Sequence, residues 1–85
     1  MRDDVKEFAY YMETVLNDNE SKGGWNQCTI EYLLEKLDHN MDEVRSGLRI
    51  ELGEVINLSA GIKTQRKTLV DIANYAMMLH SKLEL

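Results

Sequence analysis

The sequence predicts a single all-α domain that folds as an antiparallel helical bundle. Apolar residues recur every three or four positions in three separate segments, which is the spacing of one helical face. The chain contains no proline, and only one short stretch alternates as a strand would, so that strand would have no partner. Its 85 residues allow one domain, 1–85, near the lower size limit for folding without disulfides.

The first predicted helix covers residues 2–17. Asp3 and Asp4 lie in its first turn, where the helix dipole stabilises negative charge. Residues 17–24 are of turn-forming types and include Gly23-Gly24, so we expect the helix to end there. Its apolar positions are Val5, Phe8, Ala9, Met12, Val15 and Leu16.

The second predicted helix has Thr29 as its N-cap and shows the clearest periodicity in the chain. At Ser46-Gly47 it is open whether the helix ends, bends or continues. Residues 48–60 fit either a short helix or an extended link. The apolar stripe of the helix is Ile30, Leu33, Leu34, Leu37, Met41, Val44 and Leu48.

The last predicted helix runs from about Thr64 to Lys82. Within residues 69–79, nine of eleven side chains are apolar or aromatic. A helix that is apolar nearly all round must be buried nearly all round, and a monomer of this size cannot enclose it. We therefore expect a second copy to cover part of it, so that homodimerisation completes the bundle.

The composition excludes several classes of function. A net charge of −5 disfavours binding to a nucleic-acid backbone, and no apolar run reaches the ~20 residues of a membrane span. The N-terminus lacks the pattern of a signal peptide. A single cysteine, Cys28, permits no internal disulfide and fits a reducing, cytoplasmic setting.

Polar residues fall into two groups. The stripe of Glu31, Glu35, Asp38 and Asp42 lies far from the apolar stripe and predicts a solvated face. Asn40 and Glu43 flank the apolar stripe, while Thr68, Asp71 and Asn74 interrupt the apolar part of the last helix. A carboxylate in such a place is hydrogen-bonded, bound to metal or functional, and the residues alone leave these alternatives open.

Three further positions have two interpretations each, and a basic patch has one. Trp25 is a hydrophobic plug or a base-stacking platform, and Lys22 is solvated or contacts a phosphate. His80 is predicted to be a satisfied core histidine rather than an acid or base. The basic patch of residues 63–67 is predicted to neighbour acidic residues of another helix or chain.

Several segments together resemble the MazG-like nucleotide pyrophosphohydrolases, in particular short bacterial and phage members. The segments are Phe8-Ala9, Met12-Glu13, Lys22-Gly23-Gly24-Trp25, Tyr32-Leu33-Leu34 and Asp71-Ile72-Ala73-Asn74-Tyr75-Ala76-Met77-Met78. The resemblance implies an all-α MazG-like fold, assembled as dimers or tetramers. Such assemblies hydrolyse nucleoside triphosphates to the monophosphate and pyrophosphate. It also implies Mg²⁺ held by Glu-Glu-x-x-Glu on one helix and Glu-x-x-Asp on a later helix.

This chain keeps only part of that carboxylate set. The first motif falls on residues 39–43, where Glu43 matches and His39 and Asn40 replace glutamates. The second falls on residues 68–71, where Asp71 matches and Thr68 replaces a glutamate. The resemblance thus implies Glu43 and Asp71 as metal ligands and as catalytic residues together with Asn40 and Thr68. Lys22, Trp25 and Asn74 would contact the nucleotide.

Two functions therefore remain open from the sequence. Neutral oxygens hold Mg²⁺ less well than carboxylates, so a pyrophosphohydrolase with this set is expected to have weakened or lost activity. The alternative is a catalytically silent nucleotide-binding or protein-interaction module of phage or mobile-element origin.

Overall fold

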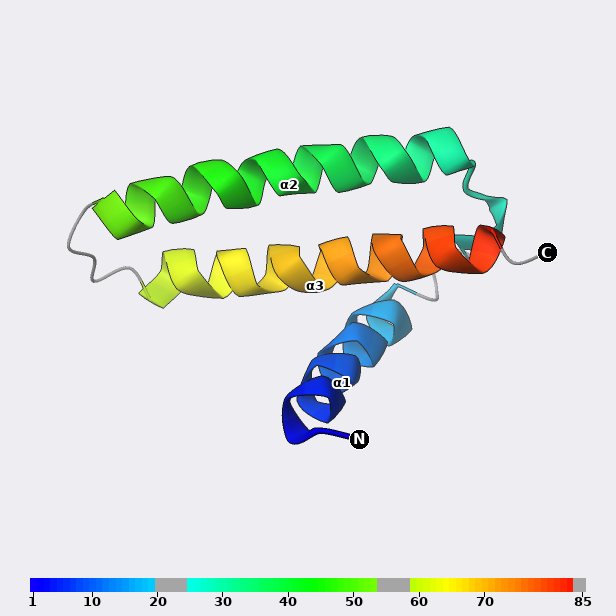
Figure 1. Cartoon of the computed structure of the whole chain (residues 1–85), viewed down its shortest axis with the longest axis horizontal. Helices are drawn as coiled ribbons and strands as arrows, with labels where there is room; N and C mark the ends of the chain where they lie inside the picture. The colour runs from blue at the N-terminus through cyan, green and yellow to red at the C-terminus, as the bar shows by residue number, and fades with distance from the viewer. Residues whose placement is uncertain (20–24, 54–58, 84–85) are drawn as a thin grey trace.

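The computed structural model describes residues 1–19, 25–53 and 59–83, and these form three α-helices and one 3₁₀ turn. The order is α1 (Asp3–Asp18), η2 (Trp25–Gln27), α2 (Ile30–Gly53) and α3 (Ser59–Lys82). The two long helices, α2 and α3, lie side by side and antiparallel, while α1 packs against α3 on the side away from α2 and diverges from it (Figure 1). Because the described residues contain no strand, the all-α prediction is confirmed.

Local sequence signals set the ends of the first two helices. The Thr29 hydroxyl oxygen accepts a hydrogen bond from the backbone N–H of Tyr32 at 3.0 Å, which confirms the predicted N-cap. At the end of α1, the Asn19 side chain donates to the carbonyl of Val15 at 2.9 Å. These bonds satisfy backbone groups that a helix end leaves without an intrahelical partner.

The stretch between the two long helices is shorter than the sequence suggested. Residues 48–53 continue α2, and α3 begins at Ser59, five residues before the predicted Thr64. A separate short helix for residues 48–60 is therefore wrong for 48–53 and 59–60, and 54–58 lie outside the described residues. Gly47 does not end α2, because it lies against α3: a Cβ there would collide with the side-chain amide of Gln65.

The core is thin and lies mainly along α3. Leu33 of α2 has no exposed surface, whereas α1 contributes no buried residue. The Cα radius of gyration is 14.4 Å, compared with about 12 Å for a compact domain of this length. Among the described residues the buried ones are Leu33, Val44, Thr68, Val70, Asn74 and Met78.

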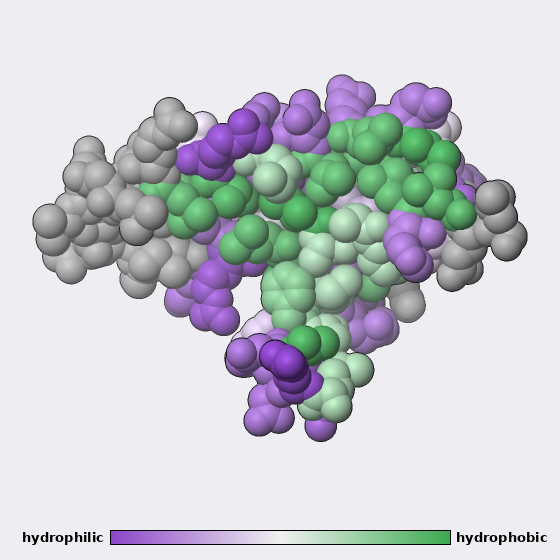
Figure 2. Space-filling view, viewed as in Figure 1, coloured by the Kyte–Doolittle hydropathy of each residue, from purple (hydrophilic) through white to green (hydrophobic). Residues whose placement is uncertain are grey.

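A single chain does not enclose α3, although the apolar composition of this helix predicts full burial. Leu69 is 41% exposed and Ala76 is also exposed. A band of hydrophobic surface accordingly runs over α2 and α3 on one face of the molecule (Figure 2). None of the helices that the structure describes has the length and apolar composition to cross a bilayer.

One core prediction is wrong and one surface prediction is confirmed. His80 is exposed rather than packed in the core, and it lies in the last turn of α3, where the helix dipole favours a cation. The predicted solvated stripe is indeed exposed at all four of its positions: Glu31, Glu35, Asp38 and Asp42.

Candidate functional site

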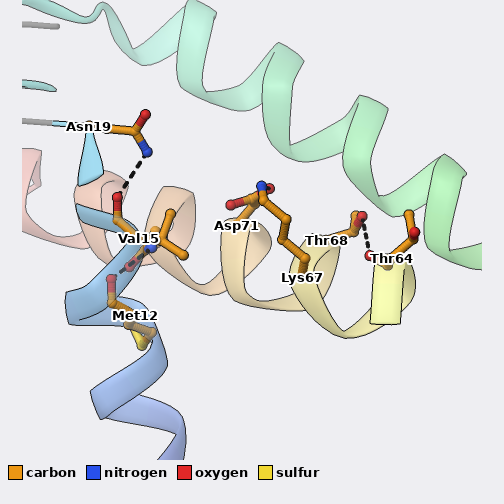
Figure 3. Close-up of polar contacts among 8 residues, drawn as sticks. Met12, Val15, Asn19, Thr64, Lys67, Thr68 and Asp71 are labelled. Carbon is orange, nitrogen blue, oxygen red and sulfur yellow. Dashed lines mark hydrogen bonds and ion pairs between the residues drawn. The ribbon is translucent and has the colours of Figure 1, made fainter. Parts of the chain in front are cut away.

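The three polar residues of α3 lie in different surroundings. They are spaced three apart, and since 3.6 residues make a turn, each points about 60° away from the last. Thr68 and Asn74 are 8% and 3% exposed, whereas the side chain of Asp71 is 27% exposed. Figure 3 shows these contacts on α3 and the adjoining part of α1.

Thr68 is turned toward its own helix. Its hydroxyl donates to the backbone carbonyl of Thr64 at 3.0 Å, one turn earlier (Figure 3). This back-bond satisfies the hydroxyl hydrogen in the seam between α2 and α3 without a partner from another helix. Both oxygen lone pairs remain, so Thr68 can still act as a neutral acceptor or ligand.

Asp71 is already paired with a cation. The ammonium of Lys67 lies 3.1 Å from its Oδ2, one turn earlier on the same helix (Figure 3). Because the lysine side chain is 69% exposed, this pair stabilises the fold by less than about 1 kcal/mol. Its importance is electrostatic, since it places a positive charge beside the only carboxylate within the apolar part of α3.

Glu43 is paired in the same way on α2. Nε2 of His39 lies 3.2 Å from Oε1 of Glu43, and their side chains are 68% and 53% exposed. Glu43 thus projects further into solvent than its place beside the apolar stripe suggested. Asn40, one turn before Val44, is half-buried and faces the seam with α3.

The helical period places Glu43 and Asp71 on the same side of the α2–α3 pair, which we call the polar face. It consists of Tyr32, Lys36, His39 and Glu43 of α2 with Lys67, Asp71 and Tyr75 of α3. From the contact of Gly47 with Gln65, a rise of 1.5 Å per residue puts Glu43 and Asp71 within about 3 Å of each other along the helix axes.

The pKa of Tyr75 supports this grouping. Burial raises the pKa of its phenol above 10.0, and the neighbouring Tyr32, Asp71 and Cys28 raise it further. Both Tyr32 of α2 and Asp71 of the same helix are thus near neighbours of Tyr75. Lys36, 5.5 Å from the ring centroid of Tyr32, extends the same stripe on α2.

Asn74 connects α1 to α3. Its amide Nδ2 donates to the backbone carbonyl of Met12 at 3.3 Å, and its Oδ1 is buried with no partner among the described residues. A buried hydrogen bond to a neighbouring helix was one alternative for Asp71, but Asn74 is the residue that makes one. With one N–H committed to α1, Asn74 offers its carbonyl oxygen and its second N–H to any ligand.

The two predicted nucleotide contacts outside the helices are less defined. Lys22 lies outside the described residues. Trp25 is half-buried in the 3₁₀ turn that precedes α2. Within the part of the chain that the structure describes, no three His, Cys, Asp or Glu side chains gather closely enough to form a metal cluster.

The structure also contains a cleft that the sequence motifs did not reveal. It has a volume of about 490 Å³ and lies between α1 and α3, where the two helices diverge. The guanidinium of Arg66 lies 6.0 Å from the ring centroid of Tyr11. The basic patch was the available signal, because it was expected to face acidic residues. The lining residues are Asp4, Glu7, Phe8, Tyr11, Lys63, Arg66, Leu69 and Val70.

Comparison with known proteins gives no relative: no protein-family model, no curated protein and no solved structure matches this chain. The MazG-like resemblance therefore stays a prediction. What the polar face offers chemically is two carboxylates, each beside a cationic or titratable partner, and the neutral oxygens of Asn40 and Thr68 in the adjoining seam.

Proposed function

We propose that this chain is a homodimeric MazG-like protein of the nucleoside triphosphate pyrophosphohydrolase type, with weakened hydrolysis. The reaction adds water across the bond between the α- and β-phosphates and yields a nucleoside monophosphate and pyrophosphate. What supports it is the approach of Gly47 to Gln65, from which helical geometry puts Glu43 and Asp71, on two different helices, on one face at nearly one level.

The donor set suits a magnesium ion in kind but is small in number. Mg²⁺ prefers hard oxygen ligands, and it is commonly held by one or two carboxylates together with substrate phosphates. Glu43 and Asp71 would hold the ion, and the side-chain oxygens of Asn40 and Thr68 would position water or phosphate. When bound, the ion neutralises phosphate charge and lowers the pKa of a water ligand.

The ion pairs on the polar face account for the weakening. To act as a ligand, Asp71 must exchange Lys67, which lies 3.1 Å away, and Glu43 must exchange His39, at 3.2 Å. The freed ammonium of Lys67 is then available to a phosphate. Because His39 and Asn40 stand where the related motif carries glutamates, less negative charge remains to hold a metal ion.

Pyrophosphate release from a panel of nucleoside triphosphates, with Mg²⁺ and with Mn²⁺, tests this function. We expect slow, metal-dependent release by the wild type and its loss in Asp71→Asn and Glu43→Gln. Glu31→Gln is the matched control, because it neutralises an exposed carboxylate of α2 on the solvated stripe. Full activity of Asp71→Asn with a normal helical circular dichroism spectrum would exclude this site.

A catalytically silent nucleotide-binding or protein-interaction module is the second candidate. It is favoured by the pairing of both carboxylates and by the intrahelical bond of the Thr68 hydroxyl. It predicts no product from any nucleotide. Thermal melting with nucleotide and Mg²⁺ distinguishes a nucleotide-binding module from a protein-interaction module. Only the nucleotide-binding module would melt at a higher temperature with the ligand than without it. Multiple turnovers per site would exclude this candidate.

A further inference from the structure

One face of the α2–α3 pair leaves large apolar side chains in contact with solvent, and we call it the apolar face. It lies opposite the polar face and corresponds to the hydrophobic band in Figure 2. Leu48 is 37% exposed, Leu34 is 51% exposed and Leu83 is 64% exposed. The face consists of Ile30, Leu34, Met41 and Leu48 of α2 with Leu69, Ala76 and Leu83 of α3.

The spacing of these residues is that of a helix-packing seam. Leu34, Met41 and Leu48 follow one another at intervals of seven, and so do Leu69, Ala76 and Leu83. Half-buried or buried residues lie between them at the alternating three- and four-residue steps of a heptad, as Leu37 and Val44 do on α2. Two helices with parallel seams on one face can pack against another such pair as a four-helix bundle.

The solvent-accessible surface area of the chain is also larger than expected for a monomer, which favours a partner on this face. The isolated chain exposes 6841 Å², whereas a folded monomer of 9.9 kDa is expected to expose about 5,200 Å². The excess of about 1,600 Å² is roughly twice the area of about 800 Å² that each partner buries in a standard interface. A second copy on the apolar face would therefore remove about half of this excess if it formed an interface of standard size.

Charges at the two edges of the face indicate how that copy is oriented. The edge along α2 is mainly acidic: Glu31, Glu35 and Asp42 each follow an apolar-face residue by one position, and the base Arg45 lies 3.6 Å from Asp42. The edge along α3 carries the exposed bases Lys63 and Arg66, which also line the α1–α3 cleft with Asp4 and Glu7 of α1. A two-fold axis parallel to the helices sets the acidic edge of each copy against the basic edge of the other. An axis across the helices would set acid against acid.

We infer that two copies of this chain dimerise through the apolar face about a two-fold axis parallel to α2 and α3. Helix α2 of each protomer packs on α3 of its partner, and the polar face of each protomer stays open to solvent. This inference rests on the homodimer included in the proposed function and adds its surface and its symmetry.

Multi-angle light scattering after gel filtration tests the surface. We expect the wild type to have twice the 9.9 kDa mass of one chain, and Leu34→Glu and Met41→Glu to lose the dimer. Tyr10→Glu is the matched control, because Tyr10 is 68% exposed on α1 and lies off the face. A monomeric wild type, or a dimer that survives both face variants, would overturn the inference.

Disulfide cross-linking tests the symmetry with substitutions that preserve the apolar face. In a Cys28→Ala background, a Met41→Cys chain is mixed with a Leu69→Cys chain under mild oxidation. The proposed axis brings α2 onto α3 of the partner, so the mixed disulfide should form faster than either homodisulfide. Predominance of the Met41→Cys homodisulfide would show that α2 packs on α2 and would overturn the proposed symmetry.

These outcomes are separable from those of the hydrolysis test. A monomeric wild type that releases pyrophosphate would overturn the dimer and leave the proposed chemistry standing. A dimer with the expected cross-link that is inert toward every nucleotide would support the interface and overturn the chemistry.

Discussion

The apolar face and the polar face of the α2–α3 pair differ in how far a single chain satisfies them. On the polar face, Glu43 and Asp71 each lie within 3.2 Å of a cationic or titratable partner on their own helix. On the apolar face, Leu34 and Met41 are 51% and 41% exposed. The polar face therefore gains little from a partner protein, whereas the apolar face gains free energy from any apolar surface that covers it.

The difference also separates two kinds of constraint on the sequence. The ion pairs of the polar face depend on one helix each, because each pair joins residues four apart on the same helix. The apolar face depends on how α2 and α3 are set beside each other. Association and chemistry can thus be altered independently, and the predictions below use that independence.

The largest effect is expected for adjacent leucines on α2 that lie on different surfaces. Leu33 is fully buried against α3, so Leu33→Ala should lower the free energy of unfolding by about 2–5 kcal/mol. Leu34→Ala removes a half-exposed side chain and should lower the free energy of unfolding of one chain by about 1 kcal/mol. If a second copy covers Leu34, the substitution should also weaken the dimer. Urea unfolding followed by circular dichroism at two protein concentrations measures both.

The concentration series supplies the control. If the second copy covers Leu34, dilution should lower the urea midpoint of the wild type, and Leu34→Ala should show the same slope from a lower starting value. An equally small cost for both substitutions would contradict the thin core described above. Equal large costs at every concentration would instead place Leu34 inside the fold of one chain.

The sequence predicts features that depend on residues nearby in the chain. It does not predict features that depend on contact with a helix distant in the chain. Thr29 was identified as an N-cap because the cap bond to Tyr32 is local. His80 falls on the apolar side of a helical wheel, yet it is exposed because none of the described helices covers that side of α3. The site residues show the same division: the pairing of Asp71 is local, but Asn74 is explained only by the approach of α1.

An intermediate effect concerns the ionisation of Tyr75 on the polar face. Its pKa is raised above 10.0 chiefly by burial, and Asp71 adds a smaller part. Asp71→Asn should lower the pKa of Tyr75 only part of the way back. Absorbance of tyrosinate during alkaline titration measures it, and Tyr75→Phe identifies the transition among the four tyrosines.

The sign of the linkage follows from the direction of the shift. A raised pKa in the folded state means that Tyr75 contributes its full stability below the ordinary value of 10.0 and loses it as pH rises through the folded value. Asp38→Asn, on the solvated edge of α2, should leave the transition in place. A complete return to the ordinary value in Asp71→Asn would show that charge rather than burial dominates.

The smallest effect is expected at Gly47, where α2 meets α3 between the two faces. Alanine is favoured over glycine within a helix by about 1 kcal/mol, but its Cβ would collide with the side-chain amide of Gln65. That amide is the end of a flexible side chain whose Oε1 is buried without a partner among the described residues. Displacing it should cost about as much as the helix gains, so Gly47→Ala should change stability by less than about 0.5 kcal/mol.

The double variant Gly47→Ala, Gln65→Ala reveals the helical gain by removing the obstacle. It should be more stable than Gln65→Ala alone by about 1 kcal/mol, and thermal unfolding of the four members of the cycle gives the coupling between the two residues. Ser46→Ala, exposed on the same turn, controls for helix propensity alone. A loss of several kcal/mol in the double variant would mean that the α3 backbone itself lies too close for a Cβ. In that case Gly47 sets the separation of the two helices and thereby the geometry of both faces.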